Sequence, residues 1–460
     1  MLTLLCAVSL PAQPALTPAI EQHIAQAEGL EVEFAVDILL PLLKTGLLKP
    51  KDEARVLATL YGRTEEAAQP FPVVPAPTDA GTSGASAIAA FGNTQLVDGL
   101  TMKLRILDRL RRIDPKQAQA LAEGLRDPAL PSVRGCDGLL IPYLGDHFFP
   151  VMSQFKGLAP IWIGSPQELA AFVKFASETK VPQDWQRNGT IIAGSLTSLQ
   201  TTDRVFTAVE LHLELGSNLE KVLARSELSS GARKSIVDAY KGYVIRHMKK
   251  ARCSDVVSQG EDSIAKGILP RVNRLIAGYQ ETPVKLEDVK PEAVIAGPSV
   301  PAASQRPDPQ TYVLMEQYSK FGNSGDRVKL ERLIDGIAKG QSDTDCKVCY
   351  LAKSTGFLLN FADKLGGADP VFEYAMSTLF NMLSDQSVKK SSPSTWIAVV
   401  KQVVNYTHHP DPKISIFFNR ELGRTSDPAL AAYLRAETLG GKKLYVANAY
   451  AKGDAFVPEF

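Results

Sequence analysis

The stretch ETPVKLEDVKPEAVIAGPSVPAASQRPDPQ, from Glu281 to Gln310, separates two long regions with a helical pattern. Proline fixes φ and lacks a backbone donor, so the six prolines of this stretch cannot lie inside a packed helical layer. Between them stand apolar residues such as Val284, Leu286 and Val294, which a free linker would not need. We therefore expect a proline-rich strap or linker, and the apolar content favours an extended strap packed against its neighbours.

The length of the chain predicts more than one structural unit, because a single hydrophobic core does not grow to 460 residues. We expect an all-α fold of two lobes, each built from short antiparallel helices in a helical-hairpin or solenoid-like arrangement, joined by the proline-rich segment. The expected divisions are a signal peptide over 1–15, an N-terminal helical region over 16–280 with a long Pro/Gly/Ser loop at 63–92, the strap at 281–310, and a C-terminal helical region over 311–460.

Apolar residues at helical spacing predict a succession of helices along both regions. No strand pattern alternates with them, which argues against the parallel α/β folds, and Thr190–Leu199 fits no single pattern. The predicted helices are Thr17–Glu28, Glu31–Thr45, Lys51–Tyr61, Asn93–Ile113, Ser165–Thr179, Asp203–Leu215, Leu219–Glu227, Ala232–Lys250, Asp255–Ala277, Asp326–Lys339, Cys346–Leu365, Val371–Leu383, Ser394–Tyr406, Pro412–Leu422 and Pro428–Leu439.

An Asp-Pro dipeptide recurs just before helical patterns. Aspartate can cap the free N–H groups of a first helical turn, and proline is already in the backbone conformation of that turn, so each dipeptide predicts a helix start. Their spacing is not constant, so they do not define a repeat family. The dipeptides are Asp114-Pro115, Asp127-Pro128, Asp369-Pro370, Asp411-Pro412 and Asp427-Pro428.

The charge and hydropathy of the chain argue against a nucleic-acid partner and against an integral membrane protein. The formal net charge is +1, which provides no overall attraction to nucleic acid, so none is expected as a partner. No apolar run reaches the roughly 18 residues needed to span a bilayer, so we do not expect an integral membrane protein. The start, MLTLLCAVSL followed by PAQPA, resembles a short secretory signal, which favours a secreted or periplasmic location over the cytoplasmic alternative.

Cysteine usage fits export. Loss of a signal peptide would remove Cys6 and leave four cysteines, for which the simplest pairing is Cys346 with Cys349 and Cys136 with Cys253. The Cys346-Lys347-Val348-Cys349 spacing is also that of thiol-disulfide enzymes, but these carry it after a strand, whereas a helical pattern precedes it here. A structural disulfide is therefore favoured over a redox site or a metal site.

Two groups of residues could bind a metal, but each has a simpler interpretation. Glu210, His212 and Glu214 would share one face only in a strand, and the flanking sequence favours a helix ended by Gly216. His408, His409 and Asp411 lie in a connection between helices, where adjacent histidines seldom bind one metal and Asp411 is expected to cap a helix. We expect no cofactor.

The densest basic cluster is a candidate anion-binding site, although a solvated helix face explains it more simply. Its members are Lys241, Arg246, Lys249, Lys250 and Arg252. The chain has no GxSxG, HExxH, GxxxxGK or GxGxxG pattern, so common hydrolase, zinc-protease and nucleotide-binding classes have no local support. We therefore expect an exported, non-catalytic binding or scaffold protein for an unknown protein, peptide or polymer. The alternatives are a thiol-disulfide redox protein using Cys346 and Cys349, and a metal-dependent hydrolase around Glu210 or His408.

Overall fold

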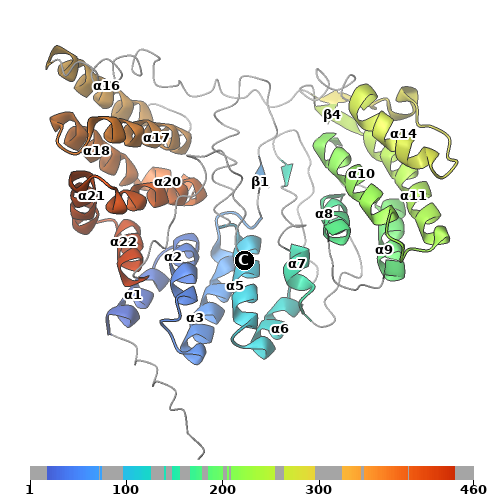
Figure 1. Cartoon of the computed structure of the whole chain (residues 1–460), viewed down its shortest axis with the longest axis horizontal. Coiled ribbons are helices and arrows are strands. Elements are labelled where there is room, and N and C mark those ends of the chain that lie inside the picture. Colours follow the sequence, from blue (N-terminus) through green and yellow to red (C-terminus); the bar gives the residue numbers. More distant parts are fainter. Residues whose placement is uncertain are drawn as a thin grey trace, which may run out of the picture.

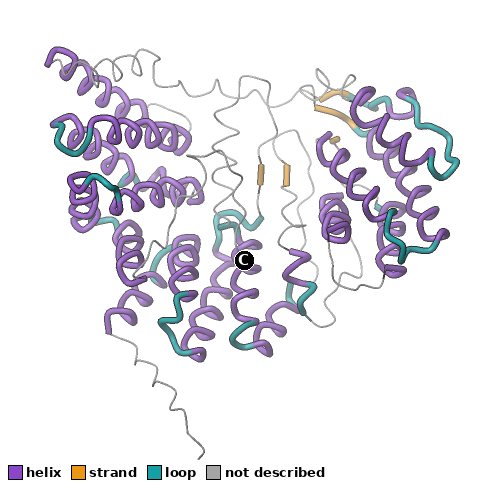
Figure 2. The backbone as a smooth tube through the Cα atoms, in the orientation of Figure 1, coloured by secondary structure: helices purple, strands orange, loops and turns teal. Residues whose placement is uncertain are grey.

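The computed structural model confirms the all-α class. Figures 1 and 2 show the described helices side by side along a U, with the N-terminal helices at its base. The structure describes residues 18–71, 73–74, 97–125, 139–140, 148–155, 166–178, 185–199, 205–206, 209–253, 264–295, 324–342, 347–391 and 393–440.

The elements follow one another with short connections wherever the described chain is continuous. The helices are α1 (Pro18–Glu28), α2 (Val32–Lys44), α3 (Pro50–Arg63), α5 (Gly99–Arg111), α6 (Pro115–Glu123), α7 (Phe149–Met152), α8 (Pro166–Glu178), α9 (Trp185–Ser198), α10 (Val209–Leu223), α11 (Ser230–Met248), α14 (Leu269–Ala277), α16 (Ser324–Ser342), α17 (Lys347–Leu365), α18 (Pro370–Leu383), α19 (Gln386–Ser391), α20 (Pro393–Asn405), α21 (Pro412–Arg424) and α22 (Pro428–Gly440). Single turns are η1 (Thr64–Glu66), the π-helical η3 (Ile264–Ile268), η4 (Leu286–Val289) and η5 (Tyr406–His408), and the strands are β1 (Val73–Val74), β2 (Leu139–Leu140), β3 (Val205–Phe206), β4 (Ala251–Cys253) and β5 (Val294–Ile295).

The Asp-Pro dipeptides begin helices, as predicted, at the four positions that the structure describes. The side chains of Asp114, Asp369, Asp411 and Asp427 each accept a hydrogen bond from a backbone N–H in the first turn of the helix that follows. The following proline is the first residue of α6, α18, α21 and α22 respectively. Asp127-Pro128 lies outside the described residues.

Most predicted helices are confirmed to within three residues, but the bounds of Asn93–Ile113 were wrong, and the two helices predicted over Asp203–Leu215 and Leu219–Glu227 are one helix, α10. Within the predicted helix Asp255–Ala277, the described elements are the π-helical turn η3 and α14. The helix predicted from Asn93 begins at Gly99, because the buried carboxylate of Asp98 caps it by accepting from the N–H of Thr101 at 2.9 Å. Gly216 does not end a helix but lies inside α10, which begins at Val209 rather than Asp203. A Cβ atom at Gly216 would lie 2.9 Å from the hydroxyl oxygen of Tyr240, so this glycine leaves room for the side chain of Tyr240 to reach α10 from α11.

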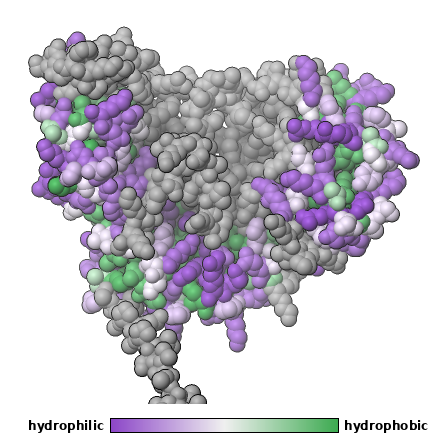
Figure 3. Space-filling view, in the orientation of Figure 1, coloured by the Kyte–Doolittle hydropathy of each residue, from purple (hydrophilic) through white to green (hydrophobic). Residues whose placement is uncertain are grey.

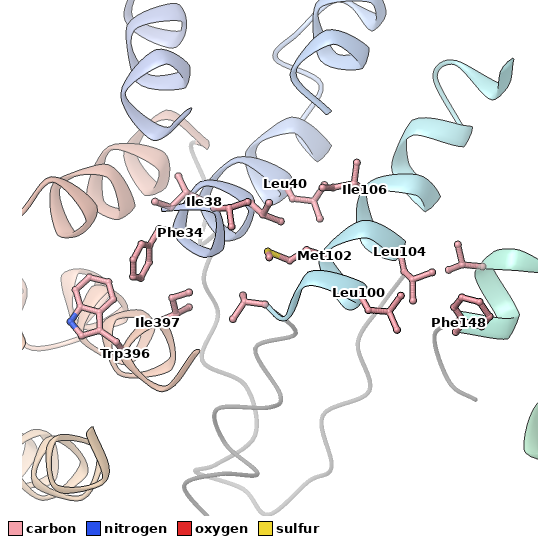
Figure 4. Packing of buried hydrophobic residues seen from close by; sticks show 14 of the residues in the cluster. Phe34, Ile38, Leu40, Leu100, Met102, Leu104, Ile106, Phe148, Trp396 and Ile397 are labelled. Atoms are coloured by element: carbon pink, nitrogen blue, oxygen red, sulfur yellow. The ribbon is translucent and has the colours of Figure 1, made fainter. Parts of the chain in front are cut away.

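Helix α2 is the centre of the hydrophobic core. Its residues are buried on every side, from Val32 to Leu43, with the exception of the half-buried Pro41. Figure 4 shows Phe34 and Ile38 of α2 between Trp396 and Ile397 of α20 on one side and Met102 of α5 on the other. The rings of Phe34 and Trp396 pack edge to face with their centroids 5.1 Å apart.

The N-terminal helices therefore pack against the C-terminal helices. Helix α1 contacts α22, and α2 contacts both α20 and α22. In Figure 1 the blue helices α1 and α2 directly continue the stack formed by α18, α20, α21 and α22. The division into two lobes at residues 281–310 stays a prediction, but the described contacts join the two regions that it separates.

The described part of the proline-rich stretch, residues 281–295, lies against α11 and α14. Val284 and Val289 are buried, and the side-chain amide of Asn273 bonds to both the N–H and the C=O of Val284, at 2.8 and 2.9 Å. Leu286, by contrast, is exposed, and the turn η4 interrupts the extended conformation that was expected. Residues 296–310 lie outside the described part of the chain.

The structure also contains short strands. The sequence pattern did not predict these strands. β1 pairs antiparallel with β2, and β3, β4 and β5 form a parallel sheet in that order. Each strand is two or three residues long, too short to carry the alternating pattern that identifies a strand.

Candidate functional site

A buried polar network connects α2, α20 and α22. Asp37 is fully buried, and its two carboxylate oxygens are bonded to the ammonium of Lys401 and to the hydroxyl of Tyr433, each at 2.7 Å. Arg105 of α5 lies within electrostatic range of Asp37, Tyr433 and Asp98, and burial lowers the pKa of its guanidinium. Burial also lowers the pKa of Lys401, an effect that the charge of Asp37 opposes. The network fixes how α2 packs on the C-terminal helices.

A second buried ion pair lies beside this network. The ammonium of Lys389 is 3.4 Å from both carboxylate oxygens of Asp427, and both side chains are 3% exposed. The same ammonium lies 4.9 Å from the ring centroid of Phe34 and 5.1 Å from that of Trp396. Because every charge in this group has an internal partner, the pair serves the packing of α19 and α22 on α2 rather than binding a ligand.

Basic side chains gather where the C-terminal ends of α2 and α5 meet. We name this set, which consists of Lys44, Arg105, Arg109, Arg111 and Arg112, the α2–α5 cationic cluster. Arg109 binds Glu53 at 2.6 Å and the carbonyl oxygen of Leu43 at 3.3 Å, which brings the two helix ends together. Asp108 is shared, because Arg112 approaches one of its oxygens at 2.9 Å and Arg111 the other at 3.6 Å.

Lys44 contributes the remaining charge of the α2–α5 cationic cluster. It is exposed, and no acceptor for its ammonium occurs among the residues that the structure describes. Its pKa is lowered by partial burial and by the positive charges of Arg105, Arg109 and Arg112, against the opposing charge of Asp108. The basic residues of α5 were not predicted as a site. Their 4- and 3-residue spacing could have indicated a common face, but the contribution of Lys44 could not be predicted.

The basic residues predicted from Lys241 to Arg252 do not act together. Lys241 binds Glu281 at 3.1 Å and Thr282 at 2.6 Å, whereas Arg246 donates to the carbonyl oxygens of Leu196 and Thr197 at the end of α9. Lys249 is exposed, Lys250 follows the end of α11, and the structure describes only the backbone of Arg252. A separation of five residues places Lys241 and Arg246 on different faces of α11.

The residues predicted as a metal site have separate partners. His408 pairs with the buried Glu437 at 2.7 Å, and His409 pairs with Asp363 at 3.2 Å. Asp411 caps α21 and accepts from the N–H of Gly367, and these backbone bonds lower the pKa of its carboxyl group. Across the described residues, no group of three or more His, Cys, Asp or Glu side chains could hold a metal ion.

The predicted disulfides stay predictions. Cys136 and Cys346 lie outside the described residues, and the structure describes only the backbone of Cys253 in β4 and of Cys349 in the first turn of α17. Glu210, His212 and Glu214 lie in α10, so the prediction of a helix there is confirmed, although their side chains are not described.

These features define an all-α protein of stacked helical hairpins with a hydrophobic core shared between its N- and C-terminal helices. None of the described helices has the length and apolar character needed to cross a membrane. No protein-family model matches the chain, and neither a curated protein nor a solved structure resembles it closely enough to indicate a relationship.

Proposed function

We propose that this chain is an exported binding or scaffold protein without catalytic activity, which presents the surface of its stacked helices to a polypeptide partner. The observation that carries this proposal is the arrangement of the helices along a U, with each hairpin contacting its neighbours (Figure 1). Stacked helical pairs expose long continuous surfaces, and proteins built in this way commonly use these surfaces for binding.

The internal bonding partners of the buried ionisable groups support the proposed absence of catalytic activity. Asp37, Lys389 and Glu437 are buried and each is bonded to a side chain of this chain, so none of them is free to act on a substrate. The proposed export rests on the first residues of the sequence and on the even number of cysteines that would remain.

A redox function is the second candidate, because Cys346 directly precedes the N-terminus of α17 and Cys349 lies in its first turn. A helix N-terminus stabilises a thiolate, as a thiol-disulfide enzyme requires. Against this candidate, the described element before the cysteines is the helix α16, whereas thiol-disulfide enzymes of the usual kind have a strand there.

Intact-mass analysis of the native protein, alkylated with and without prior reduction, tests the export and the disulfides together. We expect a chain shortened at its N-terminus whose four remaining cysteines resist alkylation until they are reduced. An uncleaved chain with freely alkylated cysteines would contradict export.

An assay of disulfide reduction on a protein substrate tests the absence of catalysis. We expect the same background rate for the native protein and for the Cys346→Ser/Cys349→Ser variant. A rate that depends on these two cysteines would favour the redox candidate instead.

A further inference from the structure

We infer that the described part of the proline-rich strap, residues 281–295, is displaceable and covers a surface of α11 and α14 that binds an extended segment of the partner polypeptide. This inference rests on the proposed function and adds the place and the chemistry of binding to it. We name the surface beneath the strap, which consists of Lys234, Lys241, the carbonyl group of Lys249 and Asn273, the α11–α14 surface. Figure 3 shows apolar side chains among polar ones at the right-hand end of the molecule, where these two helices lie.

The α11–α14 surface holds the strap largely through the strap backbone. The side-chain amide of Asn273 accepts from the N–H of Val284 at 2.8 Å and donates to the carbonyl oxygen of Val284 at 2.9 Å. Further along, the N–H of Glu292 donates to the carbonyl oxygen of Lys249 at 2.9 Å, and β5 then pairs in parallel with β4. Backbone bonds of this kind can form with any extended polypeptide, as in the addition of a peptide strand to a sheet edge.

Three side chains of the strap define the kind of segment that fits the α11–α14 surface. The carboxylate of Glu281 binds the ammonium of Lys241 at 3.1 Å and that of Lys234 at 3.2 Å. Val284 and Val289 are buried, whereas the residues between them are exposed or half-buried. The surface therefore fits a carboxylate, a small branched apolar residue three positions later, and a second one five positions after that. A partner segment with this pattern can make the same contacts and replace the strap.

The strap leaves α14 through a strained residue. Gln280 has a φ of 62°, and in the part of the chain that the structure describes it is the only residue other than glycine with a positive φ. The N–H of Glu281 donates to the carbonyl oxygen of Ile276 at 3.3 Å. The N–H of Gln280 donates to that of Ala277 at 3.1 Å, which completes a helix-ending motif that usually has glycine at this position. Because a side chain makes the left-handed conformation costly, the closed strap holds strain that opening at Gln280 releases.

Fluorescence anisotropy with a labelled peptide of the strap sequence, ETPVKLEDVKPEAVI, tests this inference. The full-length Val284→Ser/Val289→Ser variant lacks both apolar anchors, so its own strap should leave the α11–α14 surface open. This variant should bind the peptide at least about tenfold more tightly than the native chain, in which the attached strap competes at a high effective concentration. A peptide with serine at both valine positions should not bind.

Substitutions on the α11–α14 surface locate the bound peptide. In the Val284→Ser/Val289→Ser chain, Asn273→Ala should weaken binding about tenfold, because it removes both bonds to the peptide backbone. The matched substitution Asn381→Ala, at an exposed asparagine of α18, should leave the affinity within about twofold. Equal losses from the two asparagine substitutions would overturn the inference. Absence of binding by the Val284→Ser/Val289→Ser chain, with its helical circular dichroism intact, would overturn it as well.

Hydrogen exchange measures the opening of the strap with both valine anchors in place, so it decides the matter even if their substitution unfolds the chain. In the native protein the N–H of Val284 should exchange at least about tenfold faster than that of Val244, which is buried within α11. Gln280→Gly relieves the strain of the closed strap and should slow exchange at Val284 about fivefold. Equal protection of Val284 and Val244 would overturn the inference.

Two other outcomes concern the partner and the proposed function. A dimer of the native chain that the Val284→Ser/Val289→Ser substitution dissociates would assign the α11–α14 surface to a second copy and overturn the choice of a partner polypeptide. Cysteine-dependent redox activity would overturn the proposed function, whereas failure of the peptide to bind would overturn only this inference.

Discussion

His23 shows how burial sets the chemistry of one residue. It lies in α1 with 1% of its surface exposed, and neither of its ring nitrogens has a hydrogen-bond partner. Burial lowers the pKa of its imidazole to about 4, and the positive charge of Arg435 on α22 acts in the same direction. The docked helix α1 therefore holds His23 in the neutral form.

Stability should consequently fall in acid. Because the pKa of His23 is lower in the folded chain than in the unfolded chain, its contribution is complete above pH 6.5 and is lost as the pH falls toward 4. At a pH of about 5 the loss is about 2 kcal/mol. Denaturant unfolding of the native chain and of the His23→Leu variant at a pH of about 7.5 and of about 5 should show this difference. Identical pH dependence in both proteins would contradict the prediction.

Lys389 is a buried charged residue that stabilises the packing of helices. Its ammonium lies between the carboxylate of Asp427 and the rings of Phe34 and Trp396, so it contacts a helix cap and the core at once. Asp427 also accepts from the N–H groups of Ala429 and Leu430 at the start of α22. A lysine in the sequence gives no indication of such a position, because lysine is almost always exposed.

At the scale of elements, the contact of the Tyr240 side chain of α11 with α10 depends on the absence of a side chain at Gly216. The Tyr240 hydroxyl occupies the space where a Cβ atom would lie, and Tyr240 is itself fully buried. Gly194 in α9 provides the comparison, since a Cβ atom there would have no neighbour within 4 Å.

The two glycines should respond in opposite directions to replacement by alanine. Gly216→Ala should destabilise the protein by about 1–3 kcal/mol, because Tyr240 must move. Gly194→Ala should be neutral or stabilising by up to about 1 kcal/mol, because alanine favours the helix and meets no obstacle. Thermal unfolding followed by circular dichroism measures both. Equal effects at the two positions would show that Tyr240 does not fill the space beside Gly216.

At the scale of the whole molecule, the N-terminal helices complete the stack of C-terminal helices. Asp37 and Tyr433 are 396 residues apart in the sequence and share a hydrogen bond. Phe34, Lys389 and Trp396 form one buried group that draws residues from both regions. The two regions thus share a core instead of meeting only through the proline-rich stretch.

Cleavage within the proline-rich stretch should therefore leave the molecule in one piece. A specific protease site inserted after Ser304 would allow the chain to be cut, and we expect both fragments to elute together in size-exclusion chromatography. Phe34→Ala should promote their separation after cleavage, because it removes a large side chain from the shared core, while the uncut variant remains associated through its intact chain. Two folded fragments that separate without any substitution would support two independent lobes.

The sequence by itself determined the class of the fold and the positions of most helices. Caps such as Asp369-Pro370 and Asp411-Pro412 act on the next few residues, and helical spacing reports which face is buried, so both signals are local. The prediction of α20 as an amphipathic helix carrying Trp396 needed no information from elsewhere in the chain.

Only the tertiary structure decided which helices are neighbours and which charges act together. The continuous apolar run of α2 predicts burial but not its partners, and Asp37 has no sequence signal that pairs it with Lys401. Likewise, the cluster that the sequence favoured, around Lys241, is divided among separate partners, whereas Lys44 joins the arginines of α5 from another helix. Contacts of this kind depend on how surfaces fit together across the chain, and local patterns carry no record of that fit.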